Sequence, residues 1–94
     1  MSELLEDEEL SSALKKCPEW EIDKKFITRA FEFEEFMDGI EFVNNVGEIS
    51  EEAQHYPDIS VKYTKVSLKL TTHDVGGVTD LDIELAQRID HLVD

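Results

Sequence analysis

Two histidines, His55 and His73, are the residues of this chain whose type and spacing best suit proton-transfer chemistry. Histidine has an unperturbed pKa of about 6.5, so its imidazole gives or takes a proton near neutral pH. Tyr56 follows the first histidine directly and adds a phenol that can donate a hydrogen bond. Two imidazoles beside a phenol fit an acid–base reaction. They fit equally well a pair of ordinary polar residues at the end of a sheet.

The segment between the histidines predicts a β-hairpin. Apolar residues alternate with polar ones, first at odd and then at even positions: Ile59, Val61, Tyr63, Val66, Leu68 and Leu70. A two-residue loop at Thr64-Lys65 accounts for the change of parity, because it pairs residue 63 with 66, 61 with 68 and 59 with 70. All six apolar side chains then share one face of the sheet.

The same register, carried outward, brings the two histidines to one end of the hairpin. It places Tyr56 opposite His73 and Pro57 opposite Thr72. Because Pro57 has no N–H to donate, the pairing is expected to end there. By alternation His73 lies on the polar face, so the imidazoles are expected to gather at the sheet edge, outside the core.

The first third of the chain predicts a helix followed by two strands. Residues 2 to 16 are expected to form a short acidic helix with a narrow apolar stripe, which Cys17-Pro18 ends. The segment around Trp20 and residues 27 to 33 are expected to form paired strands, joined by a turn at Lys24-Lys25.

Two further helices flank the hairpin. From residue 34 to 53 apolar residues recur every three or four positions, which predicts a helix with one buried face. Thr79, with Asp82 three positions on, has the form of an N-cap, and an apolar stripe follows at Leu81, Leu85, Ile89 and Leu92. The order helix, strand, strand, helix, strand, strand, helix predicts a single α+β domain over residues 1–94. Its four-stranded antiparallel sheet carries helices on one face, a two-layer sandwich.

Composition excludes several function classes. A formal charge of −14 argues against binding nucleic acid or an anionic membrane, because both attract basic surfaces. Cys17 is the only cysteine, which suits a reducing compartment, and no stretch is typical of a signal peptide or a membrane span, so a cytoplasmic location is expected. One cysteine and three scattered histidines do not provide the close ligands of a zinc site, and Gly76-Gly77 lacks the context of a nucleotide-binding loop.

A longer set of residues keeps the spacing of a known family. It runs Glu51-x-x-x-His55-Tyr56-Pro57, then Tyr63, Thr71-Thr72-His73-Asp74, Gly76-Gly77-Val78-Thr79 and Asp82. The set resembles the pterin-4a-carbinolamine dehydratases, which show a glutamate four residues before a His-His-Pro triplet, then an aromatic residue, a second histidine element and an aspartate in the last helix. Trp20 and the Phe-x-Phe-x-x-Phe of residues 31 to 36 extend the resemblance over nearly the whole chain.

One position departs from the family pattern. Tyr56 stands where the family has the second histidine of its triplet. Tyrosine has an unperturbed pKa near 10, so it is a poor base near pH 7. Three outcomes are open: activity carried by the two remaining histidines, reduced activity, or a different pterin as substrate.

The resemblance implies dehydration of a 4a-hydroxytetrahydropterin to the quinonoid dihydropterin, a step that recycles the cofactor of aromatic amino acid hydroxylases. The leaving hydroxyl needs a proton, and the neighbouring ring nitrogen must lose one. No redox change occurs, so neither a metal nor a nicotinamide cofactor is required.

The resemblance also implies a role for each site residue. His55 and His73 would move the protons, with the acid and base assignments open, and Tyr56 would line the site and donate to the hydroxyl. The pterin would be held by Glu51, Pro57, backbone groups at Thr71, Thr72 and His73, and Trp20 stacked on its face; Asp82 would orient His73. The alternatives are a core or interface position for Trp20 and a purely helix-capping role for Asp82.

Members of the family form dimers and tetramers, so a homodimer or homotetramer is expected, with functional coupling to an aromatic amino acid hydroxylase. A second function class stays open. Mammalian relatives also act as a dimerisation cofactor of a homeodomain transcription factor, so the domain is alternatively a non-catalytic assembly module.

Overall fold

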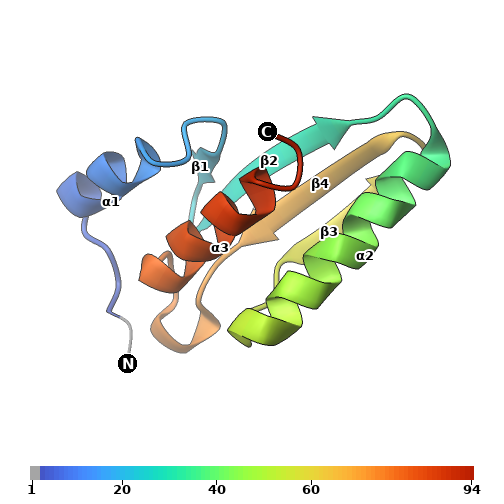
Figure 1. The fold of residues 1–94 in the computed structure, drawn as a ribbon. Coiled ribbons are helices and arrows are strands. Elements are labelled where there is room, and N and C mark those ends of the chain that lie inside the picture. The colour runs from blue at the N-terminus through green and yellow to red at the C-terminus, as the bar shows by residue number, and fades with distance from the viewer. Residues whose placement is uncertain (1–2) are drawn as a thin grey trace.

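Residues 3–94 are described by the computed structural model, and they form the expected elements in the expected order (Figure 1). The helices are α1 (Asp7–Leu14), α2 (Phe36–Ala53) and α3 (Asp80–Asp90), and a single 3₁₀ turn, η1, covers His73–Val75. The strands are β1 (Glu21–Asp23), β2 (Phe26–Glu32), β3 (Asp58–Lys62) and β4 (Lys65–Leu70). All four pair antiparallel in one sheet of order β1-β2-β4-β3, which confirms the predicted α+β class.

Helices α2 and α3 lie side by side over one face of the sheet, and α1 lies at the β1 end (Figure 1). The core between the layers is apolar and includes Ile27, Phe31, Phe42, Val46, Val66, Leu68, Leu70, Leu85 and Ile89. At Gly39 the helix comes so close to β4 that a Cβ would lie 3.3 Å from the Cγ2 atom of Val66, so glycine permits the contact. Within residues 3–94 no helix is long and apolar enough to cross a bilayer.

The two outer helices differ from the prediction in detail. Helix α1 begins at Asp7 because Glu6 and Glu9 form a capping box there; residue 2, the predicted start, lies outside the described residues. In α3 the predicted stripe is half right. Leu85 and Ile89 are buried, but Leu81 and Leu92 are each 38% exposed.

The β3–β4 hairpin has the predicted face and a different register. Val61 pairs with Val66 and Ile59 with Leu68, so the loop is Tyr63-Thr64 and the pairing is two residues away from the predicted one. A shift of two keeps every strand residue on its face, because side chains alternate with period two. Tyr63 leaves the apolar face for the turn, where it has a positive φ of 52° and is 77% exposed. The pairing begins at Asp58, directly after Pro57, as expected.

Candidate active site

Two connections, from α2 to β3 and from β4 to α3, meet at one end of the β3–β4 hairpin and enclose a hollow of about 430 Å³. It is lined by Gln54, His55, Tyr56, Pro57, Asp58, Thr71, Thr72, His73, Asp74 and Leu81. The structure therefore brings both predicted histidines to one hollow, together with Tyr56, Pro57 and the two threonines. Among the other predicted residues, Glu51, Trp20 and Asp82 are not part of the lining.

The end of α2 directs His55 into this hollow. The helix stops at Ala53 because Gln54 adopts the left-handed conformation, with φ 54° and ψ 40°. The backbone N–H of His55 donates to the carbonyl of Ser50 at 3.2 Å, which closes the last turn. His55 is thus the first residue after the helix cap, and only 12% of its side chain is exposed.

Asp82 anchors the ring of His55. Its Oδ1 atom lies 2.5 Å from Nε2 of His55, and the carboxylate is wholly buried. The structure thus contradicts the expectation that Asp82 orients His73, because both of its oxygens have other partners. Asp82 also completes the capping box of α3 with Thr79, so the capping role was predicted correctly.

The hydrogen bonds of Thr72 and Thr79 around Asp82 donate toward its carboxylate. The Thr79 hydroxyl accepts from the N–H of Leu81 and lies 2.7 Å from the Thr72 hydroxyl, which in turn donates to Oδ2 of Asp82 at 2.8 Å. The backbone N–H of Thr79 donates to the same oxygen at 2.8 Å. A carboxylate can only accept hydrogen bonds, so in its contact with Asp82 Oδ1 the donor is Nε2–H of His55. In neutral His55 the lone pair is therefore on Nδ1, which has no partner among residues 3–94.

His73 reaches the hollow from a closed loop. Thr72 and Gly77 form an isolated bridge, with the Thr72 N–H donating to the Gly77 carbonyl at 2.8 Å. The Thr72 carbonyl accepts from Val75 and Gly76, and Gly76 turns the chain with a φ of 72°. His73 starts the 3₁₀ turn inside this loop and is exposed, in contrast to the partly buried His55.

The threonines are more engaged than the sequence suggested. Thr71 donates its hydroxyl to the carbonyl of Lys25 at 2.6 Å. The backbone N–H and carbonyl of Thr72 are both used in the loop, and its hydroxyl is used by Asp82. Backbone groups of Thr72 are thus not free to hold a ligand, contrary to the expectation, and this threonine shapes the site from behind.

Tyr56 and Glu51 lie at the rim of the hollow. The Tyr56 hydroxyl donates to Oε2 of Glu51 at 2.8 Å, and both residues are exposed. The hydrogen bond to this carboxylate raises the pKa of Tyr56 above its ordinary value of 10, since it favours the protonated phenol.

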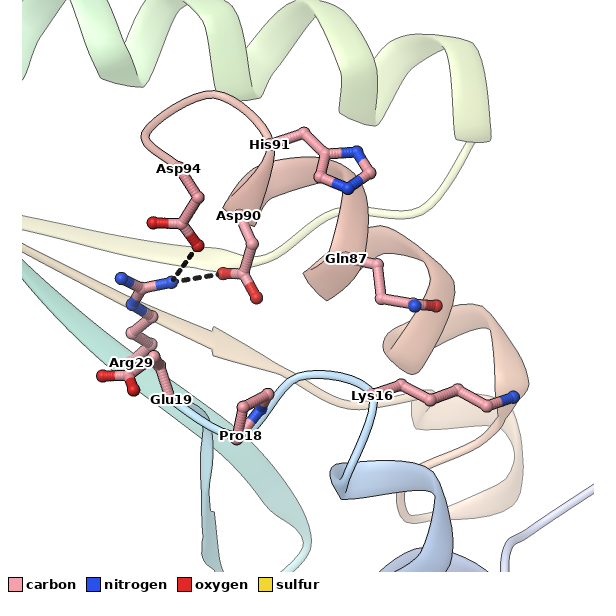
Figure 2. A pocket seen from close by; sticks show the side chains of 8 residues that line it. All are labelled: Lys16, Pro18, Glu19, Arg29, Gln87, Asp90, His91 and Asp94. Atoms are coloured by element: carbon pink, nitrogen blue, oxygen red, sulfur yellow. Dashed lines mark hydrogen bonds and ion pairs between the residues drawn. The ribbon is translucent and has the colours of Figure 1, made fainter.

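Trp20 lies elsewhere. It is 3% exposed in the core, and its indole N–H donates to Oδ1 of Asp90 at 2.8 Å, near the end of α3 that is remote from Asp82. The same oxygen lies 2.6 Å from Nη1 of Arg29, and Figure 2 shows this guanidinium facing Asp90 and Asp94 across a separate hollow of about 450 Å³. The expected stacking of Trp20 on a ligand is therefore wrong, and its alternative role as a core residue is confirmed.

Sequence reasoning missed four residues of the lining: Gln54, Asp58, Asp74 and Leu81. Each is next to a predicted position or one of its strands, so proximity in sequence was the available signal. The left-handed cap at Gln54 had none, because glutamine gives no hint of a positive φ. Among the described residues, no cluster of three or more His, Cys, Asp or Glu side chains is placed to hold a metal ion.

The family model described as pterin 4 alpha carbinolamine dehydratase matches residues 3–92. The chain belongs to this family. Relatives that carry pterin-4-alpha-carbinolamine dehydratase in their names include one from Thermomicrobium roseum, 42% identical over 94% of this chain and 95% of its own length. Another, from Picosynechococcus, is 45% identical over 98% of this chain and its full length.

Solved structures show the same fold. The crystal structure of a transcriptional coactivator/pterin dehydratase from Brucella Melitensis superposes with a TM-score of 0.92 at 30% identity, covering 98% of this chain and 100% of that one. A pterin dehydratase-like protein identified as a RuBisCO assembly factor in the alpha-carboxysome has a TM-score of 0.64 at 22% identity, covering 78% and 84%. This second likeness is one of fold alone.

Proposed function

We propose that the protein dehydrates a 4a-hydroxytetrahydropterin to the quinonoid dihydropterin, with His55 and His73 as the proton-transfer groups. The observation that carries the proposal is the shared hollow: both imidazoles line it, and one of them is fixed by a buried carboxylate. Family membership supports the same reaction class.

The reaction needs two proton transfers and no oxidant. The C4a–O bond breaks, and its electron pair leaves with the hydroxyl, which takes up a proton to become water. The proton on N5 is removed, and the electrons of that N–H bond form the new C4a=N5 double bond. One general base and one general acid on either side of the C4a–N5 bond therefore suffice, each contributing about 10²- to 10⁴-fold.

His55 takes the role of the base. With Nε2–H directed at Asp82, the neutral ring presents its Nδ1 lone pair as the only acceptor. When Nδ1 gains the N5 proton, the imidazolium lies against an ionised carboxylate, which stabilises the charge. Asp82 thus acts through His55 and does not touch the substrate.

His73 takes the role of the acid. Its ring is exposed, so it exchanges protons with water between turnovers, and the water that forms leaves directly to solvent. Pro57 and the backbone of Thr71 and His73 form further walls for the bicyclic ring, and Glu51 at the rim accepts hydrogen bonds from its N–H groups.

The test is the dehydration rate of chemically generated 4a-carbinolamine. His55→Ala and His73→Ala are each expected to lower kcat/KM by about 10²- to 10⁴-fold. His91→Ala is the matched control, because His91 is the third histidine and caps the opposite end of α3. A wild-type rate equal to that of buffer, or full activity in both variants, would contradict the proposal.

The wider setting follows from the reaction. Recycling of a tetrahydrobiopterin-type cofactor couples the enzyme to an aromatic amino acid hydroxylase in the cytoplasm, where the buried free thiol of Cys17 stays reduced. Self-association into a homodimer or homotetramer is supported by β3, an edge strand with Ile59 40% exposed.

A second candidate is an assembly module without catalysis. It is supported by the Brucella Melitensis relative, whose name joins transcriptional coactivator to pterin dehydratase. Tyr56 in place of the family's histidine would then record relaxed catalytic demand. The same assay separates the two, because a module shows no rate above buffer and loses nothing in His55→Ala. Tyr56→His measures what the tyrosine costs or contributes.

A further inference from the structure

Tyr56 and Glu51 form a contact that ties the last turn of α2 to the rim of the hollow. The Tyr56 hydroxyl lies 2.8 Å from Oε2 of Glu51, five residues earlier in the chain. Between them the left-handed Gln54 reverses the chain, so both side chains extend to the same side of the helix end. Tyr56 lines the hollow and Glu51 does not, so the phenol is what connects the carboxylate to the site.

The direction of this hydrogen bond limits what Tyr56 can do. An ionised carboxylate only accepts, so the phenol donates its single proton to Glu51. This contact with Glu51 also holds the pKa of Tyr56 above 10, so the phenol does not ionise near neutral pH. Tyr56 is therefore unsuited both as a base and as a donor to a leaving hydroxyl.

We infer that Tyr56 is a positioning residue, whose phenol holds the Glu51 carboxylate at the rim of the hollow so that its other oxygen accepts hydrogen bonds from the N–H donors of the pterin ring. The inference rests on the proposed pterin substrate. Among residues 3–94, Oε1 of Glu51 has no hydrogen-bond partner and is the free acceptor. The amino group and ring N–H on the pyrimidine side of a pterin are donors that pair well with a carboxylate.

The consequence is a split between KM and kcat. Tyr56→Phe keeps the ring and removes the hydroxyl, so nothing holds the Glu51 carboxylate in one position and the substrate loses a prearranged acceptor. KM is expected to rise roughly five- to tenfold, as for the loss of one ordinary hydrogen bond at an exposed site, while kcat stays within about twofold. Tyr63→Phe is the matched control: Tyr63 is in the β3–β4 turn, at the opposite end of the hairpin, and its KM should not change.

A double-mutant cycle tests the coupling itself. Glu51→Gln should raise KM by a similar factor, and adding Tyr56→Phe to it should cost less than twofold more, because the phenol then has no carboxylate to hold. If the two effects multiply in full, or if Tyr56→Phe lowers kcat with KM unchanged, the positioning role is wrong.

Binding of a tetrahydropterin that lacks the 4a-hydroxyl, measured by calorimetry, separates this inference from the proposed function. Weaker binding to Tyr56→Phe by the same five- to tenfold supports the positioning role even if the wild-type protein proves catalytically inert. Equal binding to both proteins overturns the positioning role even if the wild-type protein is active. No binding to the wild-type protein overturns it as well.

Discussion

Helix α3 carries a buried aspartate at each end, and the two have opposite surroundings. Asp82, in the first turn, is wholly buried and faces His55. Asp90, in the last turn, accepts from Trp20 and pairs with Arg29. Asp90 is paired with an arginine, a side chain that does not exchange its proton in proteins. Asp82 is paired with a histidine, a side chain whose ring can both give and accept a proton. The same residue type therefore anchors the core at one end of the helix and, in the proposed mechanism, supports proton transfer at the other.

The largest effect is expected for Asp82→Asn, which tests whether the Asp82 end of α3 supports catalysis. The amide keeps the size of the side chain but loses the charge that fixes the His55 tautomer and stabilises the imidazolium. We expect kcat to fall about 10²- to 10³-fold in the carbinolamine assay, with the protein still folded by urea titration. A loss of less than about threefold would show that His55 does not depend on Asp82.

Asp90→Asn should give the converse result. It leaves the Arg29 guanidinium, 15% exposed, without its buried partner, and the expected loss in free energy of unfolding is about 2 to 4 kcal/mol. The dehydration rate should stay within about twofold. Glu52→Gln is the control, since it breaks the exposed pair with Arg88, worth about 0 to 1 kcal/mol. Equal stability losses in the two variants would contradict a structural role for Asp90.

The smallest expected effect is a pH dependence of stability that comes from the Cys17 thiol, which is buried and feels the charge of Asp90. Burial, and then the charge of Asp90, raise the pKa of the Cys17 thiol to about 11 from an ordinary 9.0. In the unfolded chain the thiol loses its proton first, so between pH 9 and 11 the folded state binds more protons. The free energy of unfolding should then fall as pH rises, by at most about 1.4 kcal/mol per pH unit.

Cys17→Ala removes the titrating group and should flatten that part of the slope, whatever its own effect on stability. The measurement is urea unfolding of both proteins at several pH values from 8 to 11. Parallel pH profiles for wild type and variant would show that the thiol is not shielded.

The fold was predictable because local signals agreed with one another. Period-two alternation around residues 59 to 70 and the apolar spacing of residues 36 to 53 identified the hairpin and α2. An odd or even position decides which face of the sheet a strand residue occupies, but a register shift of two residues leaves every face unchanged. For that reason the face was right and the loop, Tyr63-Thr64, was displaced.

The sequence predicted which residues lie near one another in the site, but not which hydrogen bonds they form. A hairpin between His55 and His73 places both residues at one end of the sheet, and a register shift of two residues does not change this. Strand alternation does not predict contacts between side chains that are far apart in sequence. Asp82 faces His55 across 27 positions, and Trp20 donates to Asp90 across 70. An indole looks the same in sequence whether it stacks on a ligand or donates into the core.

The hairpin that joins the two histidines has its turn at the far end of the molecule from them. Tyr63 and Thr64 form this turn. The N–H of Phe33, the residue after β2, donates to the Thr64 carbonyl at 3.0 Å. This turn is thus the natural attachment point for a fluorophore or an immobilising tag, since a graft there leaves both strands and the histidine end of the sheet in place.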